Sequence, residues 1–155
     1  AFGPSKRWPA ERYAAVIDAL HDKVGARVVL LTGPDEEDTR EAVLSSATHA
    51  PIIPDEGRPS IDILKAVISL SDLLIGNDSG PRHVAIAFKK PVICIMGPTS
   101  PRYSEGPYET GEVLRVDVDC GPCQEPVCKT DFRCMTRIAP DAVLAAALRY
   151  LPAAR

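Results

Sequence analysis

Apolar residues along the chain follow two patterns, helical spacing and short continuous runs. Between Pro9 and Gly25 they recur every three or four residues, which is the spacing of one helix face and predicts a helix that stops at Gly25. Short apolar runs occur at 28–31, 52–53, 73–75, 91–96 and 113–116. Runs of this length, separated by segments long enough for helices, are typical of buried strands.

Further helices are predicted between these runs. The acidic residues 35–38 suit the first turn of a helix that runs to about Ala47, because negative charge is favourable at the positive end of the helix dipole. Ser60 is a candidate N-cap, Pro81 a candidate first helical residue, and Pro140 the start of a last helix. We expect these three helices to bury Ile61, Leu64, Val67 and Ile68; Val84, Ala85 and Phe88; and Val143, Ala147 and Tyr150.

Strands that alternate with helices predict an α/β fold, a parallel sheet with helices on both faces. At 155 residues the chain is long enough for one core, so we expect residues 1–155 to form a single domain. In such sheets ligands bind beyond the carboxyl ends of the strands. Three loops are expected at such ends: 33–35, 77–80 and 97–101.

Composition and charge exclude several classes of protein. The apolar content of 45% and the charged content of 25% are ordinary for a globular protein. No apolar run approaches the ~18 residues of a membrane-spanning helix, and no signal-peptide pattern opens the chain. A net charge of -3 argues against a nucleic-acid partner, because such partners need a clustered basic surface. The opening Ala1-Phe2-Gly3-Pro4 resembles a loop, so we expect the chain to be a fragment of a longer protein.

The turn at residues 77–80, between an apolar run and Pro81, is the most informative stretch. A strand that ends in such a turn before a helix directs free backbone N–H groups and the positive end of a dipole at one spot, which suits a phosphate. Ser79 and Gly80 would supply those N–H groups. Phosphate would repel Asp78, so we expect this carboxylate to accept hydrogen bonds from sugar hydroxyls. The alternative is that Asp78 only satisfies its own turn.

Other polar residues are candidates for the same phosphorylated, hydroxyl-rich ligand. Lys6 precedes the first helix and could stabilise the charge on a leaving diphosphate, or it could be a solvated surface lysine. Asp35 and Glu36 could accept the two hydroxyls of a ribose, or only complement a helix dipole. His83, in a first helical turn, is expected to be a neutral hydrogen-bonding group, with a structural role as the alternative. In the third loop, the hydroxyls of Thr99 and Ser100 are candidates for binding the ligand; alternatively, they only form hydrogen bonds within their own turn.

The five cysteines fall into two groups. Cys94 lies in an apolar run and is expected to be buried. The other four have the spacing Cys-x2-Cys-x4-Cys-x5-Cys, which leaves open a zinc site, one or two disulfides, or a packed loop with reduced thiols. Structural zinc sites typically contain two Cys-x2-Cys pairs, and only one is present here, so these residues are weak metal candidates. They are Cys120, Cys123, Cys128 and Cys134.

Four motifs in order resemble the C-terminal domain of glycosyltransferase family 9, the ADP-heptose:lipopolysaccharide heptosyltransferases. They are FGPSKRWP at 2–9, TGPDE at 32–36, NDSGPRH at 77–83, and the stretch from KPV to GPTSP at 90–101. The resemblance covers nearly the whole chain, and its first motif is most similar to the heptosyltransferase II subgroup. It implies the GT-B architecture, in which two Rossmann-like domains face a cleft and the C-terminal one holds the nucleotide sugar.

The resemblance also implies roles for single residues. Lys6 would bind the diphosphate, Asp78 the heptose, and His83 would lie close to the sugar, so these three are the catalytic candidates. An acidic residue, Asp35 or the next residue Glu36, would hold the ribose. The implied donor-binding set is Lys6, Asp35, Glu36, Asp78, Ser79, Gly80 and His83, with the loop around Pro59 and Ser60 beside the adenine.

The activity implied by the resemblance is an inverting transfer of heptose from ADP-heptose to the lipopolysaccharide inner core. This direct displacement requires no metal, and its base would be an Asp of the N-terminal domain. That acceptor-binding domain, and a strand expected just ahead of Ala1, lie outside the chain. We therefore expect the fragment to bind nucleotide and to be inactive alone.

The expected partners are the nucleotide sugar and, through the N-terminal domain, a lipid-linked core oligosaccharide. The expected location is cytoplasmic, with a peripheral position at the inner-membrane face left open. Two alternatives remain at this point. One is a GT-B protein that uses another nucleotide sugar or acts as an epimerase, and the other is an interaction module stabilised by zinc on the four-cysteine loop.

Overall fold

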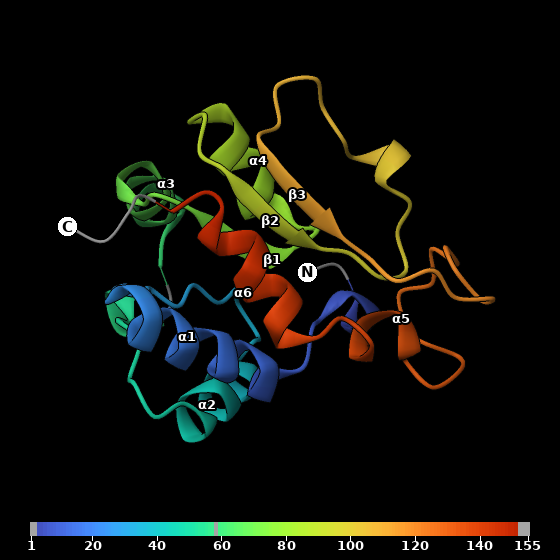
Figure 1. Cartoon of the computed structure of the whole chain (residues 1–155), viewed down its shortest axis with the longest axis horizontal. Helices are drawn as coiled ribbons and strands as arrows, with labels where there is room; N and C mark the ends of the chain where they lie inside the picture. The colour runs from blue at the N-terminus through green and yellow to red at the C-terminus, as the bar shows by residue number, and fades with distance from the viewer. Residues whose placement is uncertain (1–2, 58, 152–155) are drawn as a thin grey trace.

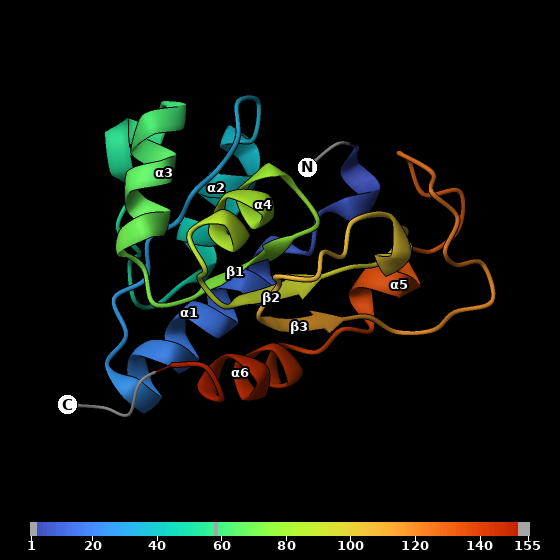
Figure 2. The ribbon, with the colours of Figure 1, turned by 90° about the horizontal axis from the view of Figure 1, so that it is seen from above.

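The computed structural model describes residues 3–57 and 59–151 and shows a parallel sheet between two layers of helices (Figures 1 and 2). The strands are β1 (Leu74–Asn77), β2 (Val92–Ile95) and β3 (Gly111–Leu114), in the order β1-β2-β3. Leu74 pairs with Val92 and Val92 with Gly111, so the three strands start level and run in the same direction. Their carboxyl ends therefore lie at one edge of the sheet.

Helices cover both faces of this sheet. Figure 2 shows α3 and α4 on one side and α1 and α6 on the other, which confirms the predicted α/β class. The helices are α1 (Ala10–Val24), α2 (Glu37–Ser46), α3 (Ile61–Leu70), α4 (Gly80–Ala87), α5 (Arg133–Thr136) and α6 (Pro140–Leu148). Short 3-10 turns lie at η1 (Pro4–Lys6), η2 (Pro54–Gly57) and η3 (Pro101–Tyr103).

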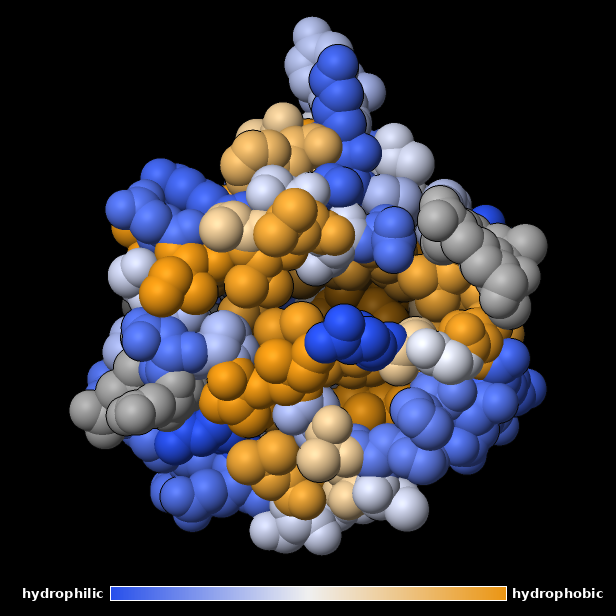
Figure 3. Space-filling view, turned by 90° about the vertical axis from the view of Figure 1, so that its left-hand side faces the viewer, coloured by the Kyte–Doolittle hydropathy of each residue, from blue (hydrophilic) through white to orange (hydrophobic). Residues whose placement is uncertain are grey.

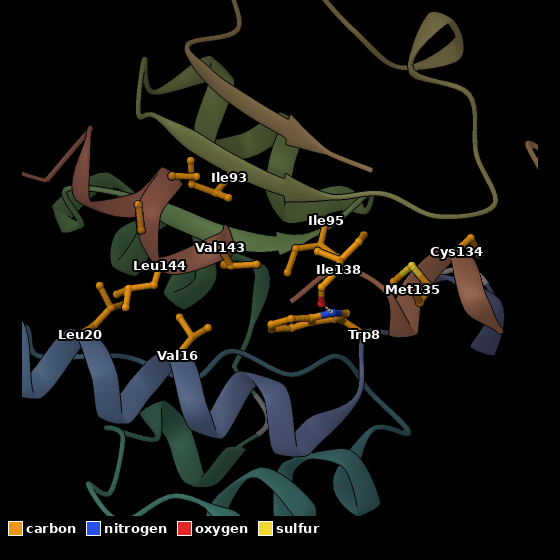
Figure 4. Packing of buried hydrophobic residues seen from close by; sticks show 12 residues of the cluster. Trp8, Val16, Leu20, Ile93, Ile95, Cys134, Met135, Ile138, Val143 and Leu144 are labelled. Carbon is orange, nitrogen blue, oxygen red and sulfur yellow. Dashed lines mark hydrogen bonds between the residues drawn. The ribbon is translucent and has the colours of Figure 1, made fainter. Parts of the chain in front are cut away.

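The side chains of β2 alternate between two apolar clusters, because successive residues of a strand point to opposite faces. Ile93 and Ile95 pack with α1, α6 and the buried Trp8 in the larger cluster (Figure 4). Val92 and Cys94 point the other way, toward α3 and α4. All four residues of β2 are at most 1% exposed. The central strand is thus the core of both layers, as its unbroken apolar run predicts.

Several sequence predictions agree closely with the structure. The helix predicted from Pro9 to Gly25 is α1, and Gly25 ends it in the left-handed conformation at φ 64°. Ser60 caps α3 as expected, its hydroxyl accepting a hydrogen bond from the N–H of Ile63 at 3.3 Å. The last helix begins at Pro140 and buries Val143 and Ala147 completely.

The strands predicted at 28–31, 52–53 and 113–116 are wrong in extent. The run at 28–31 forms a single parallel bridge, between Val29 and Ile52, because its backbone exchanges only two hydrogen bonds with the 52–53 segment. The strand predicted at 113–116 begins two residues earlier, at Gly111. Its position follows from pairing with β2, since the backbone of Gly111 comes so close to Val92 that a Cβ there would lie 1.9 Å from the Val92 carbonyl oxygen.

Details of the predicted helices also need correction. Helix α4 begins at Gly80, so Pro81 is its second residue, still in the first turn where its missing N–H costs nothing. Ile61 and Phe88 are exposed rather than buried, since they lie at the ends of α3 and α4, outside the packed turns. The short helix α5 was not predicted, because it lies within the cysteine-rich loop and has too few residues to show a period.

One face of the molecule is notably apolar. Figure 3 views the side that carries α3 and the end of α1, and shows apolar side chains around a hollow. Exposed large apolar residues of α3 and of the 51–53 segment are Ile52, Ile61 and Leu70. Within the described part of the chain, the helices are too short or too polar for any of them to cross a lipid bilayer.

Candidate functional site

Two of the predicted site residues, Lys6 and Asp78, form an ion pair at the carboxyl edge of the sheet. The Nζ of Lys6 in η1 lies 2.9 Å from Oδ2 of Asp78, which directly follows β1. The Asp78 side chain is only 8% exposed, whereas that of Lys6 is 23% exposed. The site thus contains a nearly buried carboxylate beside a cation that solvent can reach.

The residue before Asp78 holds η1 in place. Asn77 Oδ1 accepts hydrogen bonds from the backbone N–H of Trp8 at 3.3 Å and from the hydroxyl of Tyr13 at 3.0 Å. Trp8 is itself fixed, because its indole N–H donates to the carbonyl of Ile138 at 3.1 Å and its ring meets Tyr13 edge to face. The position of η1 beside Asp78 is therefore set in part by the contacts of Trp8, and not by Lys6 alone.

The cysteine-rich loop also holds η1 in place, through hydrogen bonds to Ser5. The N–H of Ser5 donates to the carbonyl of Pro126 at 3.1 Å, and the Ser5 hydroxyl donates to the carbonyl of Glu125. Gly3 adopts φ 83°, and a Cβ at this position would lie 2.5 Å from the carbonyl oxygen of Pro126. Only glycine fits both the backbone conformation and this close approach.

A second cation, Arg82, holds the other oxygen of Asp78. Arg82 is completely buried, and its Nη1 lies 3.0 Å from Asp78 Oδ1 and 2.9 Å from the hydroxyl of Ser104. Its Nε and Nη2 donate to the two carboxylate oxygens of Glu109, both at 2.7 Å. Each oxygen of Asp78 therefore has its own cationic partner.

These contacts control the charge of the site. Burial alone would raise the pKa of Asp78, but hydrogen bonds and charge from Lys6, with a contribution from Arg82, hold it below its ordinary value. Burial would likewise lower the pKa of Arg82, and the hydrogen bonds to Glu109 outweigh this and raise it. Asp78 is thus an anion with fixed orientation, able only to accept hydrogen bonds.

The first turn of α4 begins beside Asp78. Ser79 has an extended backbone and accepts no capping hydrogen bond; its hydroxyl donates instead to the carbonyl of Asn77 at 3.2 Å. Among the described residues, no side chain caps this helix at its N-cap position. Gly80 and His83 are exposed in the first turn. Binding of a phosphate by the N–H groups here remains a prediction.

The two acidic ribose candidates differ in their surroundings. Glu36 accepts a hydrogen bond from the N–H of Gly33 at 2.8 Å and lies 3.5 Å from Nε of Arg7, the residue after Lys6. Burial opposes ionisation of Glu36, but the Gly33 N–H and the charge of Arg7 are among the contacts that lower its pKa. Asp35 is exposed, with φ 61°. Glu36 is therefore in contact with Arg7, the neighbour of Lys6 in the sequence.

The other loop residues named from the sequence have different fates. Thr99, in the loop after β2, is 6% exposed, and its hydroxyl has no hydrogen-bond partner among the described residues. Ser100 precedes η3 and is partly exposed. Ser60 is engaged as the cap of α3, and Pro59 next to it is partly exposed, so the expected adenine contact at these two residues stays a prediction.

All five cysteines are free thiols in the structure. Cys94, in the central strand β2, is buried as predicted. The other four line one cavity of about 220 Å³, which Ser5 and Pro98 also border. In the described ranges, however, no three of these sulfur atoms lie together within 4.8 Å, so the loop does not form a tetrahedral thiolate centre in this conformation. Hydrogen bonds from Thr130 lower the pKa of Cys128, while burial raises that of Cys134.

Sequence reasoning missed three residues of the ion-pair network: Arg82, Glu109 and Ser104. The short spacing of Asp78 and Arg82 was a usable signal, because Asp78 lies just before α4 and Arg82 lies in its first turn. Glu109 and Ser104 carry no such signal. They lie in an irregular loop between β2 and β3, and only the folded chain brings them to Arg82.

Comparison with known proteins gives consistent results. The sequence profile of glycosyltransferase family 9 (heptosyltransferase) matches residues 1–132. Lipopolysaccharide heptosyltransferase 2 of Escherichia coli K12 is 33% identical in an alignment 118 residues long, which covers 74% of this chain and 34% of that protein. Lipooligosaccharide heptosyltransferase 2 of Campylobacter jejuni is 28% identical in an alignment 156 residues long, which covers 97% of this chain and 48% of that protein.

Solved structures agree with these relatives. ADP-heptose lipopolysaccharide heptosyltransferase II of E. coli matches with a TM-score of 0.80 and 26% identity, over 96% of this chain and 43% of that structure. A family 9 glycosyltransferase of Veillonella parvula matches with a TM-score of 0.72 and 26% identity, over 97% and 43% of the two chains. The chain thus spans less than half the length of each of these proteins. It belongs to glycosyltransferase family 9, the heptosyltransferases.

Proposed function

We propose that this chain is the donor-binding domain of an inverting heptosyltransferase that transfers heptose from ADP-heptose to the lipopolysaccharide inner core. The observation that carries the proposal is the Lys6–Asp78 pair, which lies at the carboxyl edge of a parallel sheet beside the first turn of α4. Membership of the family supports it, and the E. coli structure with a TM-score of 0.80 is named for ADP-heptose as donor.

The two partners of Asp78 suggest how the diphosphate is accepted. Lys6 is partly exposed, so its ammonium group can turn toward a phosphate without a large desolvation cost. Asp78 would not be left unpaired by this movement, because Arg82 still holds its other oxygen. Arg82 thus allows Lys6 to serve the ligand while the carboxylate keeps its place and its charge.

Displacement of ADP places growing negative charge on the diphosphate. In the proposed complex, Lys6 and the first-turn N–H groups of α4, from Gly80 onward, would stabilise that charge. Asp78 would accept hydrogen bonds from heptose hydroxyls, with His83 nearby. The buried hydroxyl of Thr99, which has no protein partner in the described part of the chain, is a further candidate donor to the ligand.

The remaining assignments follow from the same proposal. Glu36, with Asp35 as the alternative, would hold the ribose, and Ser79 would line the diphosphate. The acceptor would be a lipid-linked core oligosaccharide at the cytoplasmic face of the inner membrane. The other half of the enzyme would bind this acceptor and would also carry the base of the reaction. No metal is required for the transfer.

Calorimetric titration of the chain with ADP, UDP and GDP tests the proposal. We expect ADP to bind best, and Lys6→Ala to weaken ADP binding by about 10-fold or more, since a hydrogen bond to a charged group contributes about 1.5–3 kcal/mol. Lys65→Ala, which removes an exposed lysine of α3, is the matched control and should change nothing. Asp78→Asn should weaken ADP-heptose more than ADP.

The alternative of another nucleotide sugar gives a different result in this titration. Preference for UDP or GDP would assign the site to another nucleotide sugar. Equal binding of the three nucleotides, or ADP binding that is the same in Lys6→Ala and the wild type, would contradict the proposed donor site.

A further inference from the structure

Two of the three histidines of the chain lie face to face at the end of α1, far from Lys6. The rings of His21 and His49 stack with centroids 3.6 Å apart and an interplanar angle of 21°. His21 belongs to the last turn of α1, and His49 follows α2. With a rise of about 1.5 Å per residue, α1 places His21 about 17 Å from the start of the helix, near which the proposed donor site lies.

Asp22 places one carboxylate oxygen close to a ring nitrogen of each histidine. Its Oδ1 lies 2.9 Å from Nε2 of His49 and 3.4 Å from Nδ1 of His21. The three atoms all lie within 4.8 Å of one another. A tetrahedral zinc ion with bonds of about 2.0–2.1 Å keeps its ligand atoms about 3.3 Å apart, so the two measured separations fit such an ion. Because the two rings are nearly parallel, one of them must rotate to direct its nitrogen lone pair at the shared ion.

The backbone around His49 is held independently of its ring. Asp18, one turn before Asp22 on α1, accepts the N–H groups of Thr48 at 3.0 Å and His49 at 2.8 Å. The backbone of the third ligand is therefore anchored to the helix that carries the other two, while the half-exposed rings remain able to turn toward a shared ion.

We infer that His21, Asp22 and His49 form a binding site for a divalent transition-metal ion of the zinc type. Two imidazoles and a carboxylate are a ligand set that suits such ions, whereas Mg²⁺ and Ca²⁺ take oxygen ligands. The fourth position is filled by water. The ion links the end of α1 to the segment after α2, so it stabilises this corner of the fold and takes no part in sugar transfer.

Calorimetry with Zn²⁺, in the presence of a non-thiol reductant, measures the site. We expect one ion per chain, with His49→Ala and His21→Ala each lowering the affinity by more than about 10-fold, the least that loss of even an outer-shell partner produces. Asp22→Asn keeps the shape of the side chain and should also weaken binding, which guards against a variant that fails to fold. His83→Ala, which removes the third histidine, is the matched control.

Cobalt spectroscopy separates this site from the four-cysteine loop. Co²⁺ bound by imidazole and carboxylate shows visible d–d bands without the intense near-ultraviolet charge-transfer band that thiolate ligands produce. We expect the first spectrum, and we expect it to disappear in His49→Ala. Zinc affinity that is unchanged in the His21, Asp22 and His49 variants, or a thiolate band that persists in them, would overturn the inference.

Discussion

Arg82 and Glu109 form an ion pair with two parallel hydrogen bonds inside the protein, both at 2.7 Å. Arg82 is fully buried and Glu109 is 11% exposed. The remaining nitrogen of the guanidinium donates to Asp78. Glu109 thus acts on the candidate donor site through Arg82. It is a positioning residue that keeps Arg82 charged and oriented against Asp78.

Removal of Glu109 should destabilise the fold strongly. In Glu109→Ala the buried guanidinium loses its main partner, and breaking a buried ion pair costs about 3–5 kcal/mol. Urea denaturation monitored by circular dichroism measures this loss. The matched control is Glu112→Ala, because Glu112 makes the same two-bond contact with Arg149 at the surface, where solvent screens the pair. Similar losses in the two variants would show that burial of Arg82 is not what makes its ion pair important.

The contribution of Asp78 to stability should depend on pH. Its pKa is lowered in the folded state, so ionised Asp78 stabilises the fold above its unfolded pKa of about 4, and this contribution is lost as the pH falls through the folded pKa. Asp78→Asn should therefore be less stable than the wild type at pH 7, with a difference that shrinks below about pH 4. Urea midpoints measured between pH 7 and pH 3 check this. A difference that stays constant over that range would mean that the charge of Asp78 is not responsible.

Thr99→Val should affect stability and ligand binding in opposite directions. The substitution replaces a buried hydroxyl without a partner in the described residues by a methyl group of similar shape, which removes a desolvation penalty of about 1–3 kcal/mol. We expect a higher melting temperature and weaker binding of ADP or ADP-heptose. Thr99→Ser, which retains the hydroxyl, should bind the ligand as the wild type does. A Val variant with unchanged affinity would remove Thr99 from the proposed site.

Cys94 should be unreactive in the folded protein. Burial of its side chain between the sheet and helices α3 and α4 raises its pKa to about 12, so almost no thiolate is present near neutral pH. A disulfide reagent should modify the exposed Cys123 within the first phase of the reaction and reach Cys94 only after unfolding. Mass spectrometry of the modified peptides identifies each site. Early labelling of Cys94 would show that the sheet opens readily around β2.

The sequence predicted well those elements that depend on neighbouring residues. The limits of α1 follow from its apolar period and from Gly25, and the turn before α4 follows from Asn77 to Pro81. Resemblance to the family assigned Lys6 and Asp78 to one site, and the structure brings them to 2.9 Å. The proposed contacts of Lys6 and Asp78 with the donor remain predictions.

Where the prediction was wrong or incomplete, distant contacts decide. The apolar run at 28–31 has the composition of a strand, yet strand formation needs a partner along its length, and it finds one only at Ile52. The bond from Glu109 to Arg82 likewise has no local pattern to reveal it.

The amino-acid sequence by itself determined the α/β class, the positions of the longer helices and the family, because periodicity, capping and motifs depend on residues a few positions apart. Only the tertiary structure decided which charges meet, since an ion pair forms where the chain places two side chains within about 4 Å, however far apart they are in sequence. Lys6 and Asp78 meet in this way, and so do Arg82 and Glu109. The charge and orientation of the candidate sites are therefore properties of the fold.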